Sequence, residues 1–209
     1  FAGIPNIPKQ AKDKMAIYSL FLQHIIFSLS KKGKAAVVVP TGFITAQSGI
    51  DKAIREKLVE SKMLAGVVSM PSNIFATTGT NVSIVFMDKN NKGNVVLIDA
   101  SNLGETIKDG KNQKTVLTPK EEQQIIDTFN NKVALEDFSV VVSYDEIKQK
   151  NYSLSAGQYF EVKIEYVDIT AEEFAAKMKG FEDNLSQLFA EGRELEMEIQ
   201  NNLKGLGYE

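Results

Sequence analysis

The sequence contains no cysteine, no tryptophan and one histidine among its 209 residues. The lack of cysteine excludes disulfide bonds and thiolate metal sites and fits a reducing compartment, so we expect a cytoplasmic protein. No apolar run approaches the roughly 18 residues that a membrane-spanning helix needs, and no secretory leader precedes the first helix. We therefore expect no membrane association. The chain begins with Phe1 rather than Met, which predicts a piece of a longer protein.

Residue patterns that carry catalysis are also missing. The histidine, His24, lies within LFLQHIIF without a clustered carboxylate, so a structural role is favoured over a catalytic or metal-binding one. Neither a GxGxxG fingerprint after a strand nor a GxxxxGK[ST] loop occurs. By its own residues the chain therefore lacks a complete active site, and we predict no catalytic residue and no metal site in it.

Charge is unevenly distributed along the chain. The net charge is -3, but residues 171–209 contain nine acidic and four basic residues. No cluster of basic residues in the sequence is strong enough to indicate nucleic-acid binding by its charge alone. The acidic tail is more typical of a solvated or protein-binding face.

The first half of the chain alternates helical and strand patterns. Apolar residues recur at helical spacing over 12–31, and a second helix over 49–61 follows Ser48 as its cap. Short apolar runs predict strands at 35–40, 63–70, 81–88 and 94–100. The order predicts an α/β fold with a mostly parallel sheet, antiparallel edge strands, and later strands that close as a hairpin or meander.

The second half of the chain shows less regular helix and strand patterns. Residues 104–114 are typical of a surface loop, and Thr118 with Glu121 forms a capping box that starts a helix to about residue 131. A short strand is expected at 139–144 and a helical turn or two at 144–151.

Residues 170–209 give the clearest helical pattern. A second capping box begins at Thr170, and apolar residues then follow at alternating steps of four and three. We call these positions the heptad face: Phe174, Met178, Phe181, Leu185, Leu188, Gly192, Leu195 and Ile199. We expect this long helix to dock against a helix of a partner subunit. The alternative is that it packs locally or pairs with a second copy of itself only in a crystal.

Two loops at the ends of apolar strands are the candidate ligand-binding segments, because open α/β sheets bind ligands there. One is 37–49, and the other is 70–81, MPSNIFATTGTN. In the second, Pro71 and Gly79 allow sharp turns, and small polar side chains supply hydrogen-bonding groups. Phe75 offers a flat apolar face for a ligand; the alternative is that it fills a gap in the core.

The order of several segments resembles one family. GKAAVVVPTGFI, IREKLVES, GVVSMPSNIFATTGTNVSIVFMDK, GNVVLIDASNLG and LTPKEEQQIIDTF are similar to the second half of the methyltransferase subunit of type I restriction-modification systems. YSLSAGQYFE resembles that family's Y-x-L-x-P-G-R-Y, from which Ala156 and Gln158 depart. The resemblance covers nearly the whole chain in one order.

The resemblance implies the distal half of a Rossmann-like sheet, plus carboxyl-terminal helices, of an adenine-specific DNA methylase that uses S-adenosylmethionine. Such enzymes flip the target adenine out of the duplex because its amino group is otherwise inaccessible. The family's glycine-rich cofactor loop and its Asn-Pro-Pro-aromatic tetrapeptide are both missing from this sequence. We therefore expect this chain to be inactive alone.

The resemblance also implies roles for particular residues. An aromatic near the start of a late strand stacks on the flipped base in related methylases, and Phe75 is the matching position. Thr78, Gly79 and Asn81 would shape the pocket wall, and Pro40, Thr41 and Gly42 would border the same cleft.

Partners and domains follow from the same resemblance. Type I methylases act on DNA as two methyltransferase subunits with one specificity subunit, and a restriction endonuclease subunit joins for cleavage. We expect residues 1–102 to be the distal part of the catalytic domain, 103–169 an extension, and 170–209 a subunit-docking helix. The alternative function is a non-catalytic module that docks the specificity subunit. A methylase acting on RNA or protein is a weaker alternative.

Overall fold

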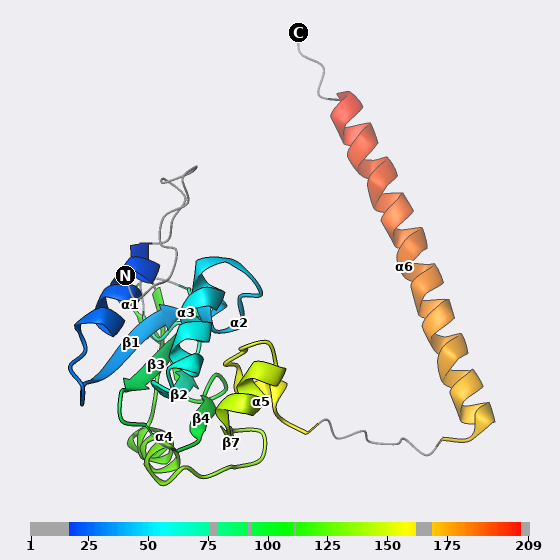
Figure 1. The fold of residues 1–209 in the computed structure, drawn as a ribbon. Helices are drawn as coiled ribbons and strands as arrows, with labels where there is room; N and C mark the ends of the chain where they lie inside the picture. The colour runs from blue at the N-terminus through cyan, green and yellow to red at the C-terminus, as the bar shows by residue number, and fades with distance from the viewer. Residues whose placement is uncertain (1–16, 76–78, 92, 111, 162–168, 206–209) are drawn as a thin grey trace. The chain divides into compact units, whose positions relative to one another are not determined.

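The computed structural model describes residues 17–75, 79–91, 93–110, 112–161 and 169–205. The chain divides into two compact units, Phe1–Glu161 and Val162–Glu209. The first unit contains a sheet with helices, and the second contains one long helix (Figure 1). The predicted domain boundaries after residues 102 and 169 stay predictions.

A five-stranded sheet with the order β1-β3-β2-β4-β7 forms the centre of the first unit. Its strands are β1 (Lys34–Pro40), β2 (Leu64–Ser69), β3 (Val82–Asp88), β4 (Val95–Asp99) and β7 (Ser139–Val142). The five strands predicted from short apolar runs are therefore confirmed, because such runs suit strands that are covered on both faces.

The strand directions correct the predicted topology. β3 is antiparallel to both β1 and β2, and β7 is antiparallel to β4, so β2 with β4 is the one parallel pair in this sheet. The expectation of a mostly parallel sheet with antiparallel strands at its edges was wrong, since β3 lies inside the sheet. β3 and β4 also form no hairpin, because β2 lies between them. β1, β2 and β4 nevertheless run in one direction.

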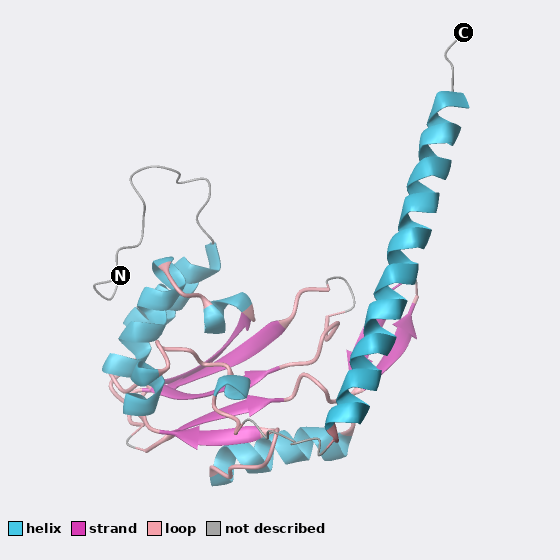
Figure 2. Ribbon diagram, turned by 90° about the vertical axis from the view of Figure 1, so that its right-hand side faces the viewer, coloured by secondary structure: helices cyan, strands magenta, loops and turns pink. Residues whose placement is uncertain are grey.

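Helices lie on both faces of the sheet (Figure 2). Four of them cover one face. They are α1 (Ile17–Ser28), α2 (Gly42–Thr45), α3 (Gly49–Glu60) and α5 (Tyr144–Gln149). Their buried side chains join those of the sheet in one core, which includes Leu22, Phe43, Ile54, Leu58, Val67, Val85, Leu97 and Ile147. Alternate residues of the strands reach this core because successive side chains point to opposite faces.

Two details of this layer differ from the sequence prediction. Residues 41–49, expected as a loop, begin with the short helix α2, whose Phe43 and Ile44 are buried. Ser48 is the N-cap residue of α3, but its side chain makes no capping hydrogen bond.

The opposite face packs against α4 (Pro119–Asn131). The ring of Phe129 lies 4.5 Å, centroid to centroid, from that of Phe86 on β3. Gly66 on β2 makes this approach possible, because a Cβ there would lie 2.5 Å from Phe129 Cε2 and 2.6 Å from the Val96 carbonyl oxygen. The predicted capping box is confirmed: Thr118 Oγ1 accepts a hydrogen bond from the Glu121 backbone, and the Glu121 carboxylate accepts one from the Thr118 backbone.

Residues 104–114 are not the surface loop that the sequence predicts. They contribute to a separate hairpin of β5 (Glu105–Asp109) and β6 (Asn112–Val116). Thr106 lies opposite Thr115, and their hydroxyl oxygens are 3.4 Å apart. Cross-strand threonine pairs of this kind stabilise antiparallel strands.

The second unit contains α6 (Ala171–Gly205), a helix of 35 residues without a buried residue. Its predicted capping box is confirmed, since Glu173 N donates to Thr170 Oγ1 and Thr170 N donates to the Glu173 carboxylate. Among the described helices, none has the length and apolar character that crossing a membrane requires.

Replacement of Gly66 by Ala should destabilise the first unit. The added methyl group would clash with Phe129 and with the backbone of β4, and overpacking of this kind costs about 1–3 kcal/mol. The measurement is the free energy of unfolding in urea. Gly157→Ala is the matched control, because nothing lies within 4 Å of a Cβ at that position; equal losses in both variants would contradict the proposed clash.

Candidate functional site

The carboxyl ends of β1, β2 and β4 meet at one edge of the sheet, where open α/β sheets bind ligands. The two loops that the sequence singles out leave from this edge. Thr41 N donates a 2.9 Å hydrogen bond to the Asn81 carbonyl oxygen, and Pro40 lies opposite Val82 in the ladder. Pro40, Thr41, Gly42 and Asn81 therefore lie close together at this edge.

A side-chain contact also joins the loop after β1 to strand β3. The hydroxyl oxygens of Thr41 and Ser83 are 3.2 Å apart. Ser83 is fully buried, whereas Thr41 is half-buried. Because a buried hydroxyl without a partner is costly, this contact fixes the end of β1 against the start of β3.

Phe75 lies in the loop that follows β2, and 48% of its surface is exposed. The alternative that it fills a gap in the core is therefore wrong. Asn73, two residues earlier, has a φ of 55° in the left-handed region. A Cβ at Gly79 would lie 3.8 Å from Asn73 Oδ1, so the two ends of this loop come close together. Thr78 lies outside the described residues.

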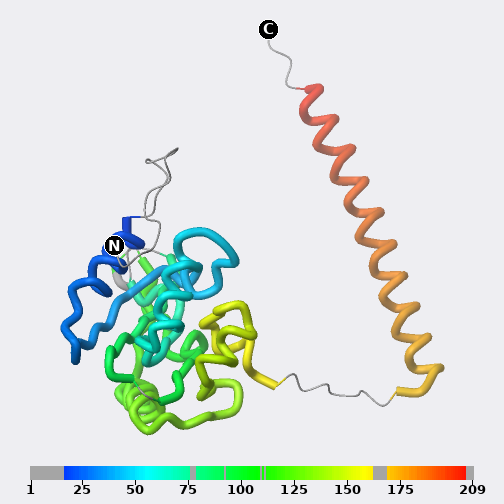
Figure 3. Tube along the Cα trace, viewed as in Figure 1, coloured from blue at the N-terminus to red at the C-terminus, as the bar shows by residue number. Residues whose placement is uncertain are grey.

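A buried arginine, which sequence reasoning missed, holds the loop after β1. The Arg55 guanidinium donates to the carbonyl oxygens of Phe43 and Ala46, and its Nε donates to that of Tyr152 at 2.8 Å. Burial lowers the pKa of Arg55 from its ordinary value, and the charge of Asp51 acts in the opposite direction. Figure 3 shows the cyan segment after β1 beside the yellow segment that contains Tyr152.

Asp51 connects this arginine to α1. Its carboxylate accepts hydrogen bonds from the Tyr18 hydroxyl and, at 2.8 Å, from the Ser19 hydroxyl. Burial and the Asp51 carboxylate together raise the pKa of Tyr18 to about 12. These hydrogen bonds therefore join α1 to α3. The raised pKa keeps the Tyr18 hydroxyl protonated.

The segment YSLSAGQY packs on the same loop. Leu154 N donates to the Ile44 carbonyl oxygen at 3.0 Å, and the Tyr159 hydroxyl donates to that of Ser153 at 2.6 Å. Burial raises the pKa of Tyr159 to about 12, with a further contribution from the charge of Glu146. This segment thus packs against α2, the short helix that follows Thr41.

A model of the family described as N-6 DNA methylase matches residues 2–167. The chain belongs to this family. It is 31% identical to the type I restriction enzyme MpnII methylase subunit of Mycoplasma pneumoniae over 80% of the chain and 32% of that relative. It is 32% identical to the HindI methylase subunit of Haemophilus influenzae over 90% of the chain and 43% of that relative.

A solved structure agrees with this N-6 DNA methylase assignment. The type I restriction-modification methyltransferase subunit from Streptococcus thermophilus matches with a TM-score of 0.63 and 26% identity, over 71% of this chain and 31% of that one. The resemblance and the fold class predicted from the sequence are confirmed. The chain spans between 31% and 43% of the lengths of these three relatives.

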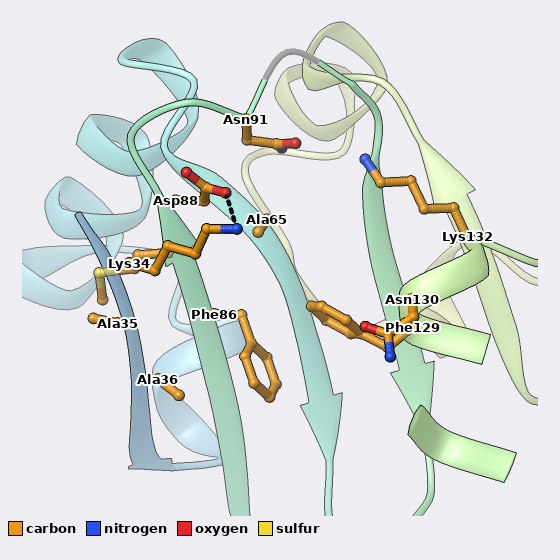
Figure 4. A pocket seen from close by; sticks show the side chains of 11 residues that line it. Lys34, Ala35, Ala36, Ala65, Phe86, Asp88, Asn91, Phe129, Asn130 and Lys132 are labelled. Atoms are coloured by element: carbon orange, nitrogen blue, oxygen red, sulfur yellow. Dashed lines mark ion pairs between the residues drawn. The ribbon is translucent and has the colours of Figure 1, made fainter. Parts of the chain in front are cut away.

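A cavity of about 400 Å³ in this methylase-family chain lies elsewhere (Figure 4). Phe86 and Phe129 line it, and Lys34 at its rim forms a 3.0 Å ion pair with Asp88. Lys34 begins β1 and Asp88 ends the antiparallel β3, so this rim lies at the sheet edge opposite the candidate site. None of the residues predicted for the site lines this cavity.

Metal-ligating residues do not gather in the part of the chain that the structure describes. His24 is exposed on α1, with its Nε2 3.5 Å from the Ser28 hydroxyl oxygen. It lies on a different element from the residues of the candidate site.

Replacement of Thr41 by Val should destabilise this methylase-family chain by about 1–3 kcal/mol, because the buried Ser83 hydroxyl loses its partner. Ser83→Ala should cost less, since the half-buried Thr41 hydroxyl can turn toward water. The double variant should cost less than the sum of the two, as measured by urea unfolding. Strict additivity would show that the two hydroxyls do not interact.

Proposed function

We propose that the chain is the distal part of the methyltransferase subunit of a type I restriction-modification system. The full-length subunit would transfer a methyl group from S-adenosylmethionine to the exocyclic amino group of adenine in DNA. The family match supports the chemistry. The observation that carries the proposal for this chain is the meeting of two loops through Thr41 and Asn81, the second of which carries the half-exposed Phe75.

The proposed contribution of this chain is one wall of the adenine pocket. A flipped base loses its stacking neighbours, and an aromatic side chain can replace them for about 1–3 kcal/mol. Phe75 would supply that stacking surface. Thr41, Thr78 and Asn81 would offer polar groups to the edge of the adenine ring. Pro40, Gly42 and Gly79 are small, so they would leave room for the base in the pocket.

The residues present do not fit the cofactor by themselves. Gly42 and Gly79 are the glycines near these strand ends, and Gly42 begins α2 rather than a glycine-rich turn that could hold the ribose or the methionine part of the cofactor. The sequence also lacks the family's glycine-rich loop and its Asn-Pro-Pro-aromatic tetrapeptide. No step of the transfer is therefore assigned to residues of this chain, which we expect to be inactive without the remainder of the subunit.

Phe75→Ala in the full-length subunit should lower the rate of adenine methylation. A loss of about 1–3 kcal/mol of base stacking corresponds to about a 5- to 150-fold decrease in kcat/KM. The measurement is transfer of labelled methyl groups to duplex DNA that contains the recognition site.

The control for this experiment is Phe21→Ala. Phe21 is 63% exposed on α1, so its removal tests the loss of an exposed phenyl ring away from the candidate site. Both variants should keep the wild-type thermal midpoint. Equal loss of methylation in both, or a loss that follows the thermal midpoint, would contradict the stacking role.

The heptad face of α6 favours a second function, the docking of another subunit. Its seven apolar side chains are between 42% and 61% exposed. With Phe174 and Phe181 at d positions, the flanking e and g positions include Glu182, Glu191, Glu196 and Glu198. In a parallel pair of identical helices Lys177 of one would lie against Glu182 of the other, but Glu191 would lie against Glu196, so the acidic excess is not compensated.

We therefore propose a different chain with basic flanking residues as the partner of α6. The DNA specificity subunit is the candidate partner, and a second methyltransferase subunit and the restriction endonuclease subunit would complete the assembly. This docking role is compatible with the methylase role, because it uses another unit of the chain.

Leu188→Asp should weaken this docking. Burying a leucine contributes about 1.5–3 kcal/mol, so its loss raises the dissociation constant about 10- to 150-fold. Calorimetry with the specificity subunit measures the change. Ser186→Asp, two residues away and off the heptad face, should bind normally. Both variants should keep wild-type helix content and cofactor binding; equal affinities would exclude this face as the docking surface.

A further inference from the structure

We propose that the β5–β6 hairpin contacts the DNA backbone next to the extruded adenine. The proposal rests on the proposed methylase function and extends it to residues that neither the family match nor the sequence motifs single out. Its basis is the attachment of the hairpin to the Phe75 loop and the chemistry of its exposed side chains.

The hairpin is fixed directly to the candidate site. Thr115 N on β6 donates a 2.9 Å hydrogen bond to the carbonyl oxygen of Asn73, two residues before Phe75. Thr115 is buried, whereas most of the other hairpin side chains are exposed. Figure 2 draws the two short strands apart from the five-stranded sheet.

The base of the hairpin is held just as firmly. Gly104 N donates a 2.9 Å hydrogen bond to the Glu121 carboxylate at the start of α4. Gly104 has a φ of +84°, and a Cβ there would lie 2.8 Å from the Thr115 side chain. Because both its base and one of its edges are anchored, the hairpin has a defined position beside the Phe75 loop.

Several side chains of the hairpin are of kinds that bind phosphate. Lys108 lies opposite Gln113, and Lys114 lies opposite Ile107, so the two lysines are on opposite faces of the ribbon. Lys108 is exposed and Lys114 is half-buried. Neither lysine forms a salt bridge with any residue that the structure describes, whereas Lys34 at the opposite edge is paired with Asp88. Lysine, threonine, asparagine and glutamine are among the side chains that hydrogen-bond the phosphate and sugar groups of DNA.

DNA is the partner that this arrangement favours. If the adenine is extruded toward Phe75, the flanking duplex must lie beside the same edge of the sheet, within reach of the hairpin. A two-stranded ribbon also fits the width of the major groove. Glu105 and Asp109, at the two ends of β5, reduce the net positive charge of the ribbon, so the contact is assigned to Lys108 and Lys114 individually.

Lys108→Ala and Lys114→Ala test this contact in the full-length subunit assembled with its specificity partner. The dissociation constant for duplex DNA is measured between 50 and 200 mM salt. Each lost phosphate contact should reduce the slope of log K against log salt by about 1. Between 50 and 200 mM salt, the affinity of the wild type for DNA should therefore fall by a factor about 3.5 times larger than that of each variant.

The sequence dependence of the effect is a second readout. Each variant should weaken binding to specific and unrelated duplexes by similar factors, because phosphate contacts carry no sequence information. Lys32→Ala is the matched control, an exposed lysine in the turn before β1, at the opposite edge of the sheet. It should keep the wild-type slope, and all three variants should keep the wild-type thermal midpoint.

Wild-type salt slopes in both hairpin variants, with adenine methylation intact in the wild type, would overturn the hairpin contact and leave the methylase function standing. Loss of binding to the specificity subunit with an unchanged salt slope would identify the hairpin as a protein-binding surface and overturn the proposal. Absence of methyl transfer to any DNA by the wild-type assembly would instead contradict the proposed function.

Discussion

The buried guanidinium of Arg55 is the constraint on which the candidate site depends. It is fully buried, and its hydrogen bonds reach three backbone carbonyl oxygens from two distant segments of the chain. Removing a charged group from water is costly unless its donors are satisfied, and arginine offers five donors in a planar fork. A lysine has one nitrogen and could not bridge the same three carbonyl groups. This side chain therefore holds the loop after β1 to the segment around Tyr152, and the hydrogen bond from Leu154 N to the Ile44 carbonyl oxygen adds to it.

The position of the site follows from that constraint. Phe43 and Ala46 come directly after Pro40, Thr41 and Gly42, so fixing their carbonyl groups also fixes the turn at the end of β1. Thr41 then reaches Asn81 through the backbone and Ser83 through its hydroxyl. Asp51 places a negative charge near the guanidinium and ties the network to Tyr18 on α1. The helical layer and the loops at the sheet edge are thus linked by hydrogen bonds and by the charge interaction between Asp51 and Arg55.

Parts of this structure could be predicted because they depend on local sequence. Apolar valine-rich runs located the strands, and the boxes at Thr118 and Thr170 located two helix starts, since a capping residue and its partner are three positions apart. Strand direction was mispredicted, because an apolar run indicates burial and not orientation. The hairpin was missed because its residues are mostly polar and charged. Arg55 was missed because a charged residue on an amphipathic helix usually faces solvent, and its three acceptors are carbonyl groups that no side-chain pattern reveals.

The candidate site shows the same limit. The sequence predicts that the two loops share one edge, since both follow strands that run in the same direction. The Thr41–Ser83 contact requires the register between β1 and β3, which the sequence pattern does not specify.

Phe75 alone would be weak evidence, because single exposed apolar residues are common on protein surfaces. Its loop is more informative than its exposure: Asn73 adopts a left-handed conformation and accepts a hydrogen bond from Thr115, while Asn81 accepts one from Thr41. Phe75 therefore lies two residues from an anchored backbone position, and a base-stacking surface requires support of this kind.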